Sequence, residues 1–515
     1  MLRRTFCIPL FISCAIRINA QVWLDPTFGN GGVVSISLAA TYDVATCMAL
    51  QPDGKIVVGG TYADTPDHAD FMLARYEADG SLDAGFGNGG WNILDYGLFD
   101  VVNDLALQPD GGIVLAGTTQ SAGTDKVIMR FTPTGQLDPT FNGNGYMIID
   151  DSFQEDQLKG VAVQSDGKIV AVGQGFDGGK DVFYICRLNG DGTFDTTFGG
   201  TGEVEHTISG DNCRANDVAI MPDGRIVSVG TSYSDASTKF DAVAVRYLTD
   251  GTLDPAFDGD GKAVFMWSFL DDIALAVVVQ PDGKVLMGGT QSEVGPDTRV
   301  AVSRMNADGS HDSGFGTNGT MRTWTGIAST RCGGLALDAA GGIVVAGAAA
   351  SSGVARRSYV CRLSVMDGAL DPDFGTGGEL LHPGIGPDEE TPAVAVQPDG
   401  KILVAGSGGA GISIDVRLLR YLGTPLTGIA DASTAAPMRL LHADAEGVDV
   451  VVTSTDVLTC RIVDMKGTIV ATAGTGGFAA GVQRIDFGTT LAAGAYSLVV
   501  GAEGGTASFP FVVLP

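Results

Sequence analysis

Seven arginines and seven aspartates recur at regular spacing and are the residues best placed to act together. The arginines are Arg75, Arg130, Arg187, Arg246, Arg304, Arg362 and Arg420. The aspartates are Asp25, Asp83, Asp138, Asp195, Asp254, Asp312 and Asp371. A ring of exposed guanidinium groups could bind an anionic glycan. However, each arginine has apolar neighbours, and a buried guanidinium needs a carboxylate partner. The sequence therefore predicts seven structural Arg–Asp pairs, each joined through both carboxylate oxygens.

Two acidic, glycine-rich turns, at residues 189–193 and 258–261, have the composition of calcium-binding loops. A full calcium loop supplies six to eight oxygen ligands in order, including a bidentate carboxylate. Neither turn meets this requirement, and turn formation alone accounts for aspartate and glycine at these positions. The sequence favours ordinary turns, with calcium binding as the alternative.

No other residues form a recognisable catalytic or metal-binding pattern. The five histidines, His68, His206, His311, His382 and His442, are far apart in sequence, and none is expected at metal-ligand spacing from a carboxylate. There is no Gly-x-Ser-x-Gly motif and no phosphate-binding glycine loop before a helix. The sequence thus predicts no catalytic residues, no cofactor-binding residues and no metal ligands, and hence a protein that is not an enzyme.

A repeated Pro-Asp-Gly motif organises the elements that carry these residues. It occupies residues 51–55, 108–111, 164–168, 221–225, 280–284 and 397–401, with Ser165 replacing proline once, and residues 338–342 are a degenerate copy. Proline favours the first corner of a type I turn, aspartate suits the second, and glycine takes the left-handed position. Because apolar runs flank each copy, each is predicted to be the tip of a β-hairpin.

The repeat, of about 57 residues, extends over residues 24–421 and contains four apolar segments in each copy. The arginine lies in the third segment, and a Leu-Asp-x-x-Phe-Gly element follows it. Four short strands per repeat and seven repeats predict a seven-bladed β-propeller. The region opens on a fourth-strand segment, residues 33–37, and ends on a third-strand segment, residues 416–421. The first segment is therefore expected to complete the last blade and close the ring.

The ordered motifs Leu-Asp-x-x-Phe-Gly, Gln-Pro-Asp-Gly-Lys and an apolar strand ending in arginine resemble the bacterial delta-60 repeat family. The resemblance covers most of the chain after its first 20 residues. It implies a propeller-like extracellular array and no enzymatic activity, because the family has no assigned chemistry.

The two ends of the chain differ from the repeat. Residues 1–20 resemble a secretory signal peptide, with Arg3 and Arg4 before a short apolar core; a lipoprotein signal ending at Cys14 is the alternative. No later stretch is apolar and long enough for a transmembrane helix. Residues 422–437 are predicted to be a linker, and residues 438–515 a small β-sandwich of seven strands. Residues 461–467 and 491–500 resemble the C-terminal sorting domain of type IX secretion cargo, which implies the type IX secretion machinery as a partner.

Charge and cysteine content narrow the possible partners. The net charge of −29 argues against binding to nucleic acid or anionic membranes, and is compatible with solubility outside the cell or with cation binding. Six cysteines lie after residue 20 at irregular spacing without a metal-binding pattern. Cys186 and Cys361 precede repeated arginines and are expected to be small core residues.

The sequence predicts a non-enzymatic β-propeller, secreted or at the cell surface, that binds or scaffolds an extracellular glycan or protein. The alternative is an extracellular propeller enzyme that acts on polysaccharide, with acid and base carboxylates at one mouth of the ring. Such enzymes carry divergent loops at one face. Connections between blades appear short and similar in the sequence, which favours the non-enzymatic function.

Overall fold

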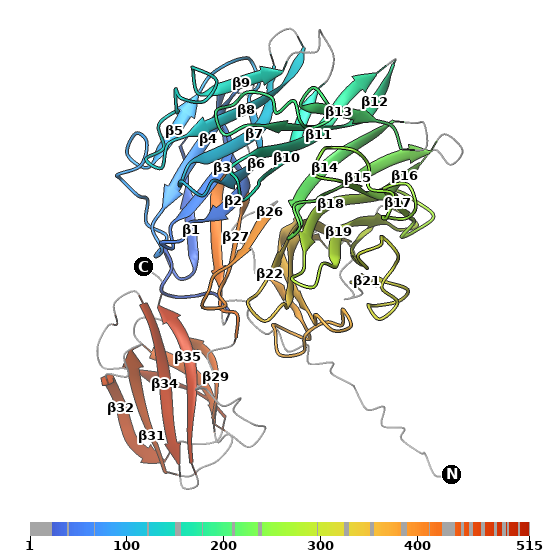
Figure 1. Cartoon of the computed structure of the whole chain (residues 1–515). Coiled ribbons are helices and arrows are strands. Elements are labelled where there is room, and N and C mark those ends of the chain that lie inside the picture. The colour runs from blue at the N-terminus through green and yellow to red at the C-terminus, as the bar shows by residue number, and fades with distance from the viewer. Residues whose placement is uncertain are drawn as a thin grey trace, which may run out of the picture.

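The computed structural model shows an all-β protein (Figure 1). It describes residues 23–38, 41–65, 67–120, 123–149, 156–177, 179–208, 212–234, 239–295, 297–323, 329–350, 355–382, 389–410 and 413–424. Beyond these it describes residues 438–443, 447–452, 457–464, 469–477, 481–486, 491, 494–502 and 505–513. The predicted signal peptide and most of the predicted linker lie outside these residues. No helical segment with the length and apolar character needed to span a bilayer occurs among them.

Within the described residues, twenty-eight strands form seven four-stranded antiparallel blades, and one parallel bridge between Tyr42 and Ile414 joins the first blade to the last. Blade 1 contains β2 (Tyr42–Leu50), β3 (Ile56–Thr65), β4 (His68–Tyr76) and β5 (Trp91–Leu94). Blade 2 contains β6 (Val101–Leu107), β7 (Ile113–Gln120), β8 (Thr124–Phe131) and β9 (Tyr146–Ile149). Blade 3 contains β10 (Gln157–Val163), β11 (Ile169–Asp177), β12 (Lys180–Leu188) and β13 (Glu203–His206). Blade 4 contains β14 (Cys213–Ile220), β15 (Ile226–Ser234), β16 (Lys239–Tyr247) and β17 (Lys262–Phe265).

The remaining three blades complete the ring. Blade 5 contains β18 (Asp272–Val279), β19 (Val285–Ser292), β20 (Thr298–Met305) and β21 (Thr320–Arg322). Blade 6 contains β22 (Ser329–Leu337), β23 (Ile343–Ala350), β24 (Arg357–Leu363) and β25 (Glu379–Leu381). Blade 7 contains β26 (Glu390–Val396), β27 (Ile402–Ala410), β28 (Ser413–Tyr421) and β1 (Val33–Ile36). The first strand of each blade lies near the axis of the ring, and the fourth lies at its periphery (Figure 1).

The Pro-Asp-Gly motifs form the hairpin tips between the first two strands of each blade, as predicted. In blade 1, Gly54 N–H donates to Gln51 O at 2.9 Å, and Gln51 N–H donates to Lys55 O at 2.9 Å. The glycine at this position has φ between 83° and 87° in all seven copies, including the degenerate one. This left-handed conformation strongly favours glycine over residues that carry a Cβ atom.

The ring closes through its first strand, which confirms the sequence prediction. β1 pairs antiparallel with β28, with Val33 opposite Leu419 and Ile36 opposite Val416. The chain before β1 adds two backbone hydrogen bonds at this seam: Asp25 N–H donates to Arg420 O at 2.8 Å, and Arg420 N–H donates to Gly32 O at 2.9 Å. The last blade therefore contains strands from both ends of the repeat region.

The hydrophobic core is divided among the interfaces between blades. Seven clusters of buried residues each join two neighbouring blades, as Val57 and Leu115 do between blades 1 and 2. The phenylalanine of every Leu-Asp-x-x-Phe element is fully buried; these residues are Phe28, Phe86, Phe141, Phe198, Phe257, Phe315 and Phe374. Each blade is therefore stabilised mainly by its two neighbours.

The described cysteine side chains form no disulfides. Cys47, Cys186, Cys213, Cys332 and Cys361 are buried free thiols, which confirms the prediction that Cys186 and Cys361 are core residues.

Seven further strands form two antiparallel sheets after residue 437, as the predicted small β-sandwich requires. One sheet contains β29 (Met438–Ala443), β30 (Gly447–Val452) and β33 (Gly481–Asp486). The other contains β31 (Val457–Asp464), β32 (Ile469–Gly477), β34 (Gly494–Ala502) and β35 (Gly505–Val513). None of these strands pairs with a strand of the propeller.

Candidate functional site

The repeated arginines pair with the repeated aspartates in every blade, as predicted. The Nε to Oδ2 distance is between 2.7 and 2.9 Å for Arg75–Asp83, Arg187–Asp195, Arg246–Asp254, Arg304–Asp312, Arg362–Asp371 and Arg420–Asp25. The Arg130–Asp138 pair is looser, with 3.3 Å between NH1 and Oδ2. Most of these arginines are nearly buried, and the Arg246 side chain is only 1% exposed.

The expectation that each aspartate would use both oxygens for its arginine was wrong. In blade 3, Asp195 accepts from Arg187 through Oδ2 alone. Its Oδ1 accepts from the backbone N–H of Thr197 at 3.1 Å and from the Thr197 hydroxyl at 2.7 Å. The carboxylate thus orders its own turn as well as the arginine, and this local competition for Oδ1 was missed at the sequence level.

Each arginine also connects its blade to the next one. Arg75 donates from NH1 to Pro133 O at 2.6 Å, and Arg187 donates to Thr249 O at 2.6 Å. The same contact recurs around the ring, and Arg420 returns to Ala78 O of blade 1. Six of the guanidinium groups lie 4.4–5.0 Å from the centroid of a buried phenylalanine ring. Hydrogen bonds and ion pairs within the ring thus engage each of these arginines, as the prediction of structural pairs requires.

The basic residue at the hairpin tip shares the same aspartate, a contact that the sequence analysis missed. Five blades have this second cation, in the pairs Lys55–Asp83, Lys168–Asp195, Arg225–Asp254, Lys284–Asp312 and Lys401–Asp25, at 2.8–3.3 Å. In blade 1, the hydrogen bond from Lys55 is the largest effect that lowers the pKa of Asp83, to about 2. The basic residue that follows the Asp-Gly in five of the seven hairpin tips was the signal available in the sequence.

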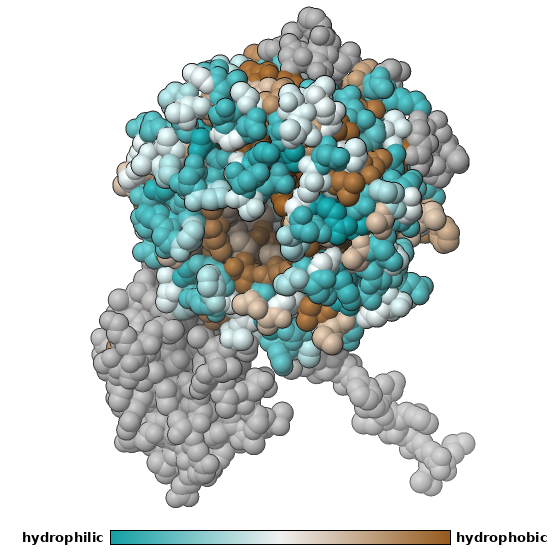
Figure 2. Space-filling model, viewed as in Figure 1, coloured by the Kyte–Doolittle hydropathy of each residue, from teal (hydrophilic) through white to brown (hydrophobic). Residues whose placement is uncertain are grey.

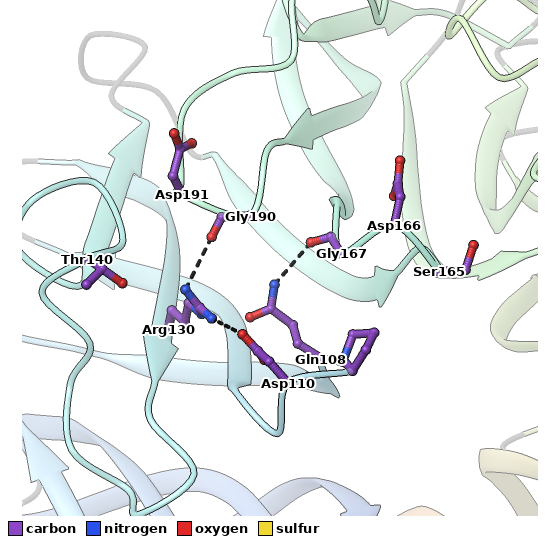
Figure 3. A pocket seen from close by; sticks show the side chains of 10 residues that line it. Gln108, Asp110, Arg130, Thr140, Ser165, Asp166, Gly167, Gly190 and Asp191 are labelled. Carbon is purple, nitrogen blue, oxygen red and sulfur yellow. Dashed lines mark hydrogen bonds and ion pairs between the residues drawn. The ribbon is translucent and has the colours of Figure 1, made fainter.

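Blade 2 departs from this pattern and contains a pocket. Gly112 replaces the tip lysine, and Arg130 NH2 donates to Asp110 of the hairpin tip instead. A pocket of about 490 Å³ lies beside this pair, between the turns of blades 2 and 3 (Figure 3). Gln108 donates across it to Gly167 O at 3.1 Å. The pocket thus lies beside a hairpin tip that lacks the repeated cation.

The two acidic turns show the hydrogen bonds of ordinary turns. Asp191 Oδ1 accepts from Thr193 N–H at 3.0 Å and from the Thr193 hydroxyl at 2.7 Å, and these bonds lower the pKa of Asp191. Asp258 has a φ of 48°, and its N–H donates to Asp308 O at 2.8 Å in the turn of the next blade. These contacts agree with the interpretation as turns, and calcium binding remains to be measured.

The innermost strands carry polar residues that link neighbouring blades around the axis. Each has a bulge, and the bulged Asn103 donates to Leu158 O of the next blade at 2.7 Å. Asp104 accepts from Val161 N–H at 2.8 Å, and Asp217 accepts from Val277 N–H at 2.7 Å, each again across a blade interface. Burial raises the pKa of both carboxyl groups. Figure 2 shows the ring from one side, with a hollow at its centre that has hydrophobic residues on its rim.

The two faces of the ring differ in the regularity of their loops. We call the side with the Pro-Asp-Gly tips the hairpin face and the opposite side the loop face. On the hairpin face, all seven tips have five residues, and the turns between the third and fourth strands of blades 1–6 have 14 or 15. On the loop face, the connections contain 2–8 residues. Those between blades have five to eight residues, which agrees with the expectation that they are short, and in five of them a buried acidic residue lies where the connection meets the next strand: Asp43, Asp100, Asp156, Asp272 and Glu389.

The loop face carries an exposed apolar patch between blades 4 and 5. We define it as Met266, Phe269 and Val294, which are 77%, 94% and 97% exposed. Their two loops are joined by a hydrogen bond from Ser292 N–H to Asp271 O at 2.8 Å. Contiguous exposed apolar patches, unlike single exposed apolar residues, often mark interaction sites.

The histidines occupy separate environments. His206 is hydrogen-bonded to the Tyr247 hydroxyl at 2.6 Å, and burial lowers its pKa to about 4. His382 is buried beside Glu389, and His311 contacts the ring of Phe265. His442 lies in β29, where the structure describes only the backbone. The expectation that no histidine lies at metal-ligand spacing from a carboxylate was wrong for His68, which shares a group of potential ligands with two aspartates.

Comparison with known proteins agrees with the repeat architecture. The family model described as "Domain of unknown function (DUF5122) beta-propeller" matches residues 51–86, 108–141, 164–198, 222–257, 280–315, 341–374 and 397–423. The ring is therefore built from seven repeats of this kind. No curated protein matches the chain.

Several solved structures are similar over the propeller at low sequence identity. A protein of unknown function from Dyadobacter fermentans is 13% identical, with 76% of this chain and 99% of that chain covered and a TM-score of 0.40. The polysaccharide lyase Uly1 is 11% identical, with coverages of 73% and 90% and a TM-score of 0.44. Sqt1 of Chaetomium thermophilum is 12% identical, with coverages of 75% and 97% and a TM-score of 0.41.

Proposed function

We propose that the chain is a non-enzymatic β-propeller of the delta-60 type, exported from the cell, that binds an extracellular ligand through its loop face. The difference between the two faces carries this proposal. The hairpin face repeats one pattern, and its charged groups are largely occupied by one another. The loop face has connections of two to eight residues and exposes the apolar patch. A regular scaffold that presents variable loops is a common design for binding proteins.

Asp104 and Asp217 near the axis join neighbouring blades. Asp104 accepts from the N–H groups of Leu105 and Val161, and Asp217 accepts from those of Val218 and Val277. These bonds use one lone pair on each carboxylate oxygen. The test of the proposal therefore follows cleavage of a bound polysaccharide as well as binding.

A glycan array with and without calcium tests the binding function, with Phe269→Ser as the informative variant. We expect the wild-type protein to bind at least one glycan class and Phe269→Ser to bind it at least about tenfold more weakly, because an aromatic contact is lost. Met366→Ser is the matched control, since Met366 is 78% exposed but lies on the hairpin face.

Two results would contradict the proposal. Equal loss of binding in both variants would remove the loop face as the binding site. Release of cleavage products from a bound polysaccharide would make the protein an enzyme and favour the alternative function.

We also propose that residues 438–515 are a sorting domain that directs export through the type IX secretion machinery. Their resemblance to such domains at residues 461–467 and 491–500 motivates this proposal. Strands β29–β35 pair with one another and not with strands of the propeller, which supports a separable domain. Secretion would place the ring and its loop face outside the cell.

Truncation after Thr424 tests two points: that the propeller folds without residues 425–515, and that residues 438–515 direct export. Leu422 N–H donates to Trp23 O at 2.7 Å, and Gly423 O accepts from Arg362, so these residues must be retained with the ring. We expect the truncated chain to melt within a few degrees of the propeller transition of the full chain. In the native host it should accumulate in the periplasm. Surface delivery of the truncated chain would exclude the sorting role, and failure to fold would exclude the boundary.

A further inference from the structure

We infer that His68, Asp70 and Asp95 form a binding site for a divalent transition-metal ion of the zinc class on the loop face of blade 1. One potential ligand atom from each residue lies within 4.8 Å of the others. His68 Nδ1 is 3.4 Å from Asp70 Oδ1, and His68 Nε2 is 3.6 Å from Asp95 Oδ1. Two ligands of a tetrahedral ion, each bonded at about 2.1 Å, are about 3.4 Å apart. The two distances start from different ring nitrogens, and an ion between the three residues would use one of them, with all three ligand atoms within 4.8 Å of one another.

The backbone holds the three residues together although they come from two segments. His68 and Asp70 lie two residues apart on β4, and side chains at this spacing share one face of a strand. Between them, Ala69 N–H donates to Leu98 O at 3.1 Å, and Ala69 O accepts from Asp100 N–H at 2.7 Å. These two bonds fix residues 95–100 against β4 and bring Asp95 beside the histidine.

Asp100 fixes the loop that carries Asp95. Its side chain is fully buried, and its Oδ2 accepts from the N–H groups of Tyr96 and Gly97 at 2.7 and 3.2 Å. Its Oδ1 accepts from the Thr119 hydroxyl at 2.6 Å. The site is therefore supported by a second layer of hydrogen bonds, as metal sites in proteins usually are.

Asp70 shows that the local charge is not balanced by protein groups. It is only 7% exposed, and its Oδ1, which faces His68, has no hydrogen-bond partner. Three further carboxylates, those of Asp95, Asp100 and Asp64, lie close enough to act on Asp70. Among the described residues, no lysine or arginine pairs with Asp70 or Asp95. A divalent cation would neutralise this group of carboxylates.

The ligand set selects the class of ion. Imidazole nitrogen suits zinc and neighbouring transition metals, whereas calcium and magnesium prefer oxygen ligands alone. The side chains of His68 and Asp95 are 32% and 65% exposed, so water can complete the coordination shell. Three protein ligands with an open position are also the usual arrangement when zinc binds an exogenous ligand.

Blade 4 provides an internal comparison. Lys239 and Asp241 lie seven and five residues before the repeated Arg246, as His68 and Asp70 lie before Arg75. Met266 follows the last residue of the fourth strand, as Asp95 does in blade 1. The carboxylate is retained and burial raises its pKa, but the ammonium group of Lys239 lies close enough to oppose this shift. Met266 removes the third ligand. Blade 4 therefore has the same framework without the capacity to hold a metal.

Calorimetric titration of the untagged, chelator-treated protein with zinc chloride tests the inference. We expect one zinc ion per chain and an increase in melting temperature with zinc. In His68→Ala and Asp95→Ala the affinity should fall at least about tenfold, and the melting temperature should no longer respond to zinc. Both side chains are partly exposed, so both variants should fold, which circular dichroism can verify.

Asp241→Asn in blade 4 is the matched control, and it should bind zinc like the wild-type protein. Absence of zinc binding by the wild-type protein would overturn the inference. So would equal zinc affinity in the wild-type protein and in His68→Ala and Asp95→Ala, because the ion would then bind elsewhere.

Discussion

Replacing Arg187 with alanine is expected to lower the free energy of unfolding by about 3–5 kcal/mol, because it breaks a buried ion pair and leaves a carboxylate behind. Arg187 is 5% exposed. It donates to Asp195 at 2.7 Å and to Thr249 O of blade 4 at 2.6 Å, and its guanidinium lies 4.7 Å from the Phe198 ring centroid. Alanine would thus remove a contact within blade 3 and a contact to blade 4. Urea unfolding followed by tryptophan fluorescence measures the change.

Lys168→Ala separates this effect from charge removal in general. Lys168 pairs with the same Asp195 at 3.1 Å, but its side chain is 30% exposed. Exposed pairs contribute little, so a loss of at most about 1 kcal/mol is expected. If Arg187→Ala unfolded like the wild-type protein but bound ligand poorly, the repeated arginines would be a binding site and the structural assignment would be wrong.

Deleting residues 21–38 is expected to prevent the ring from closing and to cost about 5 kcal/mol or more. The deletion removes β1 and uncovers the edge of β28, which is a template for pairing with another chain. It also removes Asp25, the partner of Arg420, and Phe28, which is fully buried between blades 7 and 1. Light scattering and thermal unfolding should show aggregation and a broad transition at lower temperature.

A synthetic peptide of residues 21–41 provides the control. Added to the deleted protein, it should pair with β28 and restore much of the melting temperature, as strand addition does in other sheets. A peptide of the same composition in scrambled order should have no effect. A deleted protein that remained monomeric and melted like the intact one would show that β1 does not hold the ring closed.

The repeat itself made the propeller predictable from sequence. Seven copies of a hairpin tip such as residues 51–55 gave the blade count, because proline, aspartate and glycine at fixed positions determine the turn. The phase of the repeat gave the closing strand, and the recurring Arg187–Asp195 spacing gave the buried pairs. These features depend on local sequence or on a period that the chain repeats seven times. These features can therefore be predicted without knowledge of the tertiary structure.

The composition of the candidate sites depends on tertiary contacts that the sequence repeat does not predict. Asp95 comes beside His68 because Ala69 pairs with the backbone of the next connection, which is a tertiary contact. Lys168 shares Asp195 with Arg187 because the hairpin tip folds over the turn that follows the third strand. The apolar patch combines loops from two blades, which a backbone hydrogen bond from Ser292 to Asp271 brings together. In each case the residues were visible in the sequence, but their proximity was not.

The pairing of Asp25 with Arg420 has a consequence for the order of folding. The two residues are 395 positions apart, whereas Arg187 and Asp195 are eight apart. Each doubling of loop length costs about 0.6 kcal/mol of closure entropy, so contact between the distant pair in an otherwise unfolded chain would cost about 3 kcal/mol more. Ring closure is therefore expected to follow assembly of the intervening blades. During synthesis from the N-terminus, β1 emerges first and has no partner until β28 is complete. Ring closure therefore requires all seven blades, because a chain that stops before its seventh blade has no β28 with which β1 can pair.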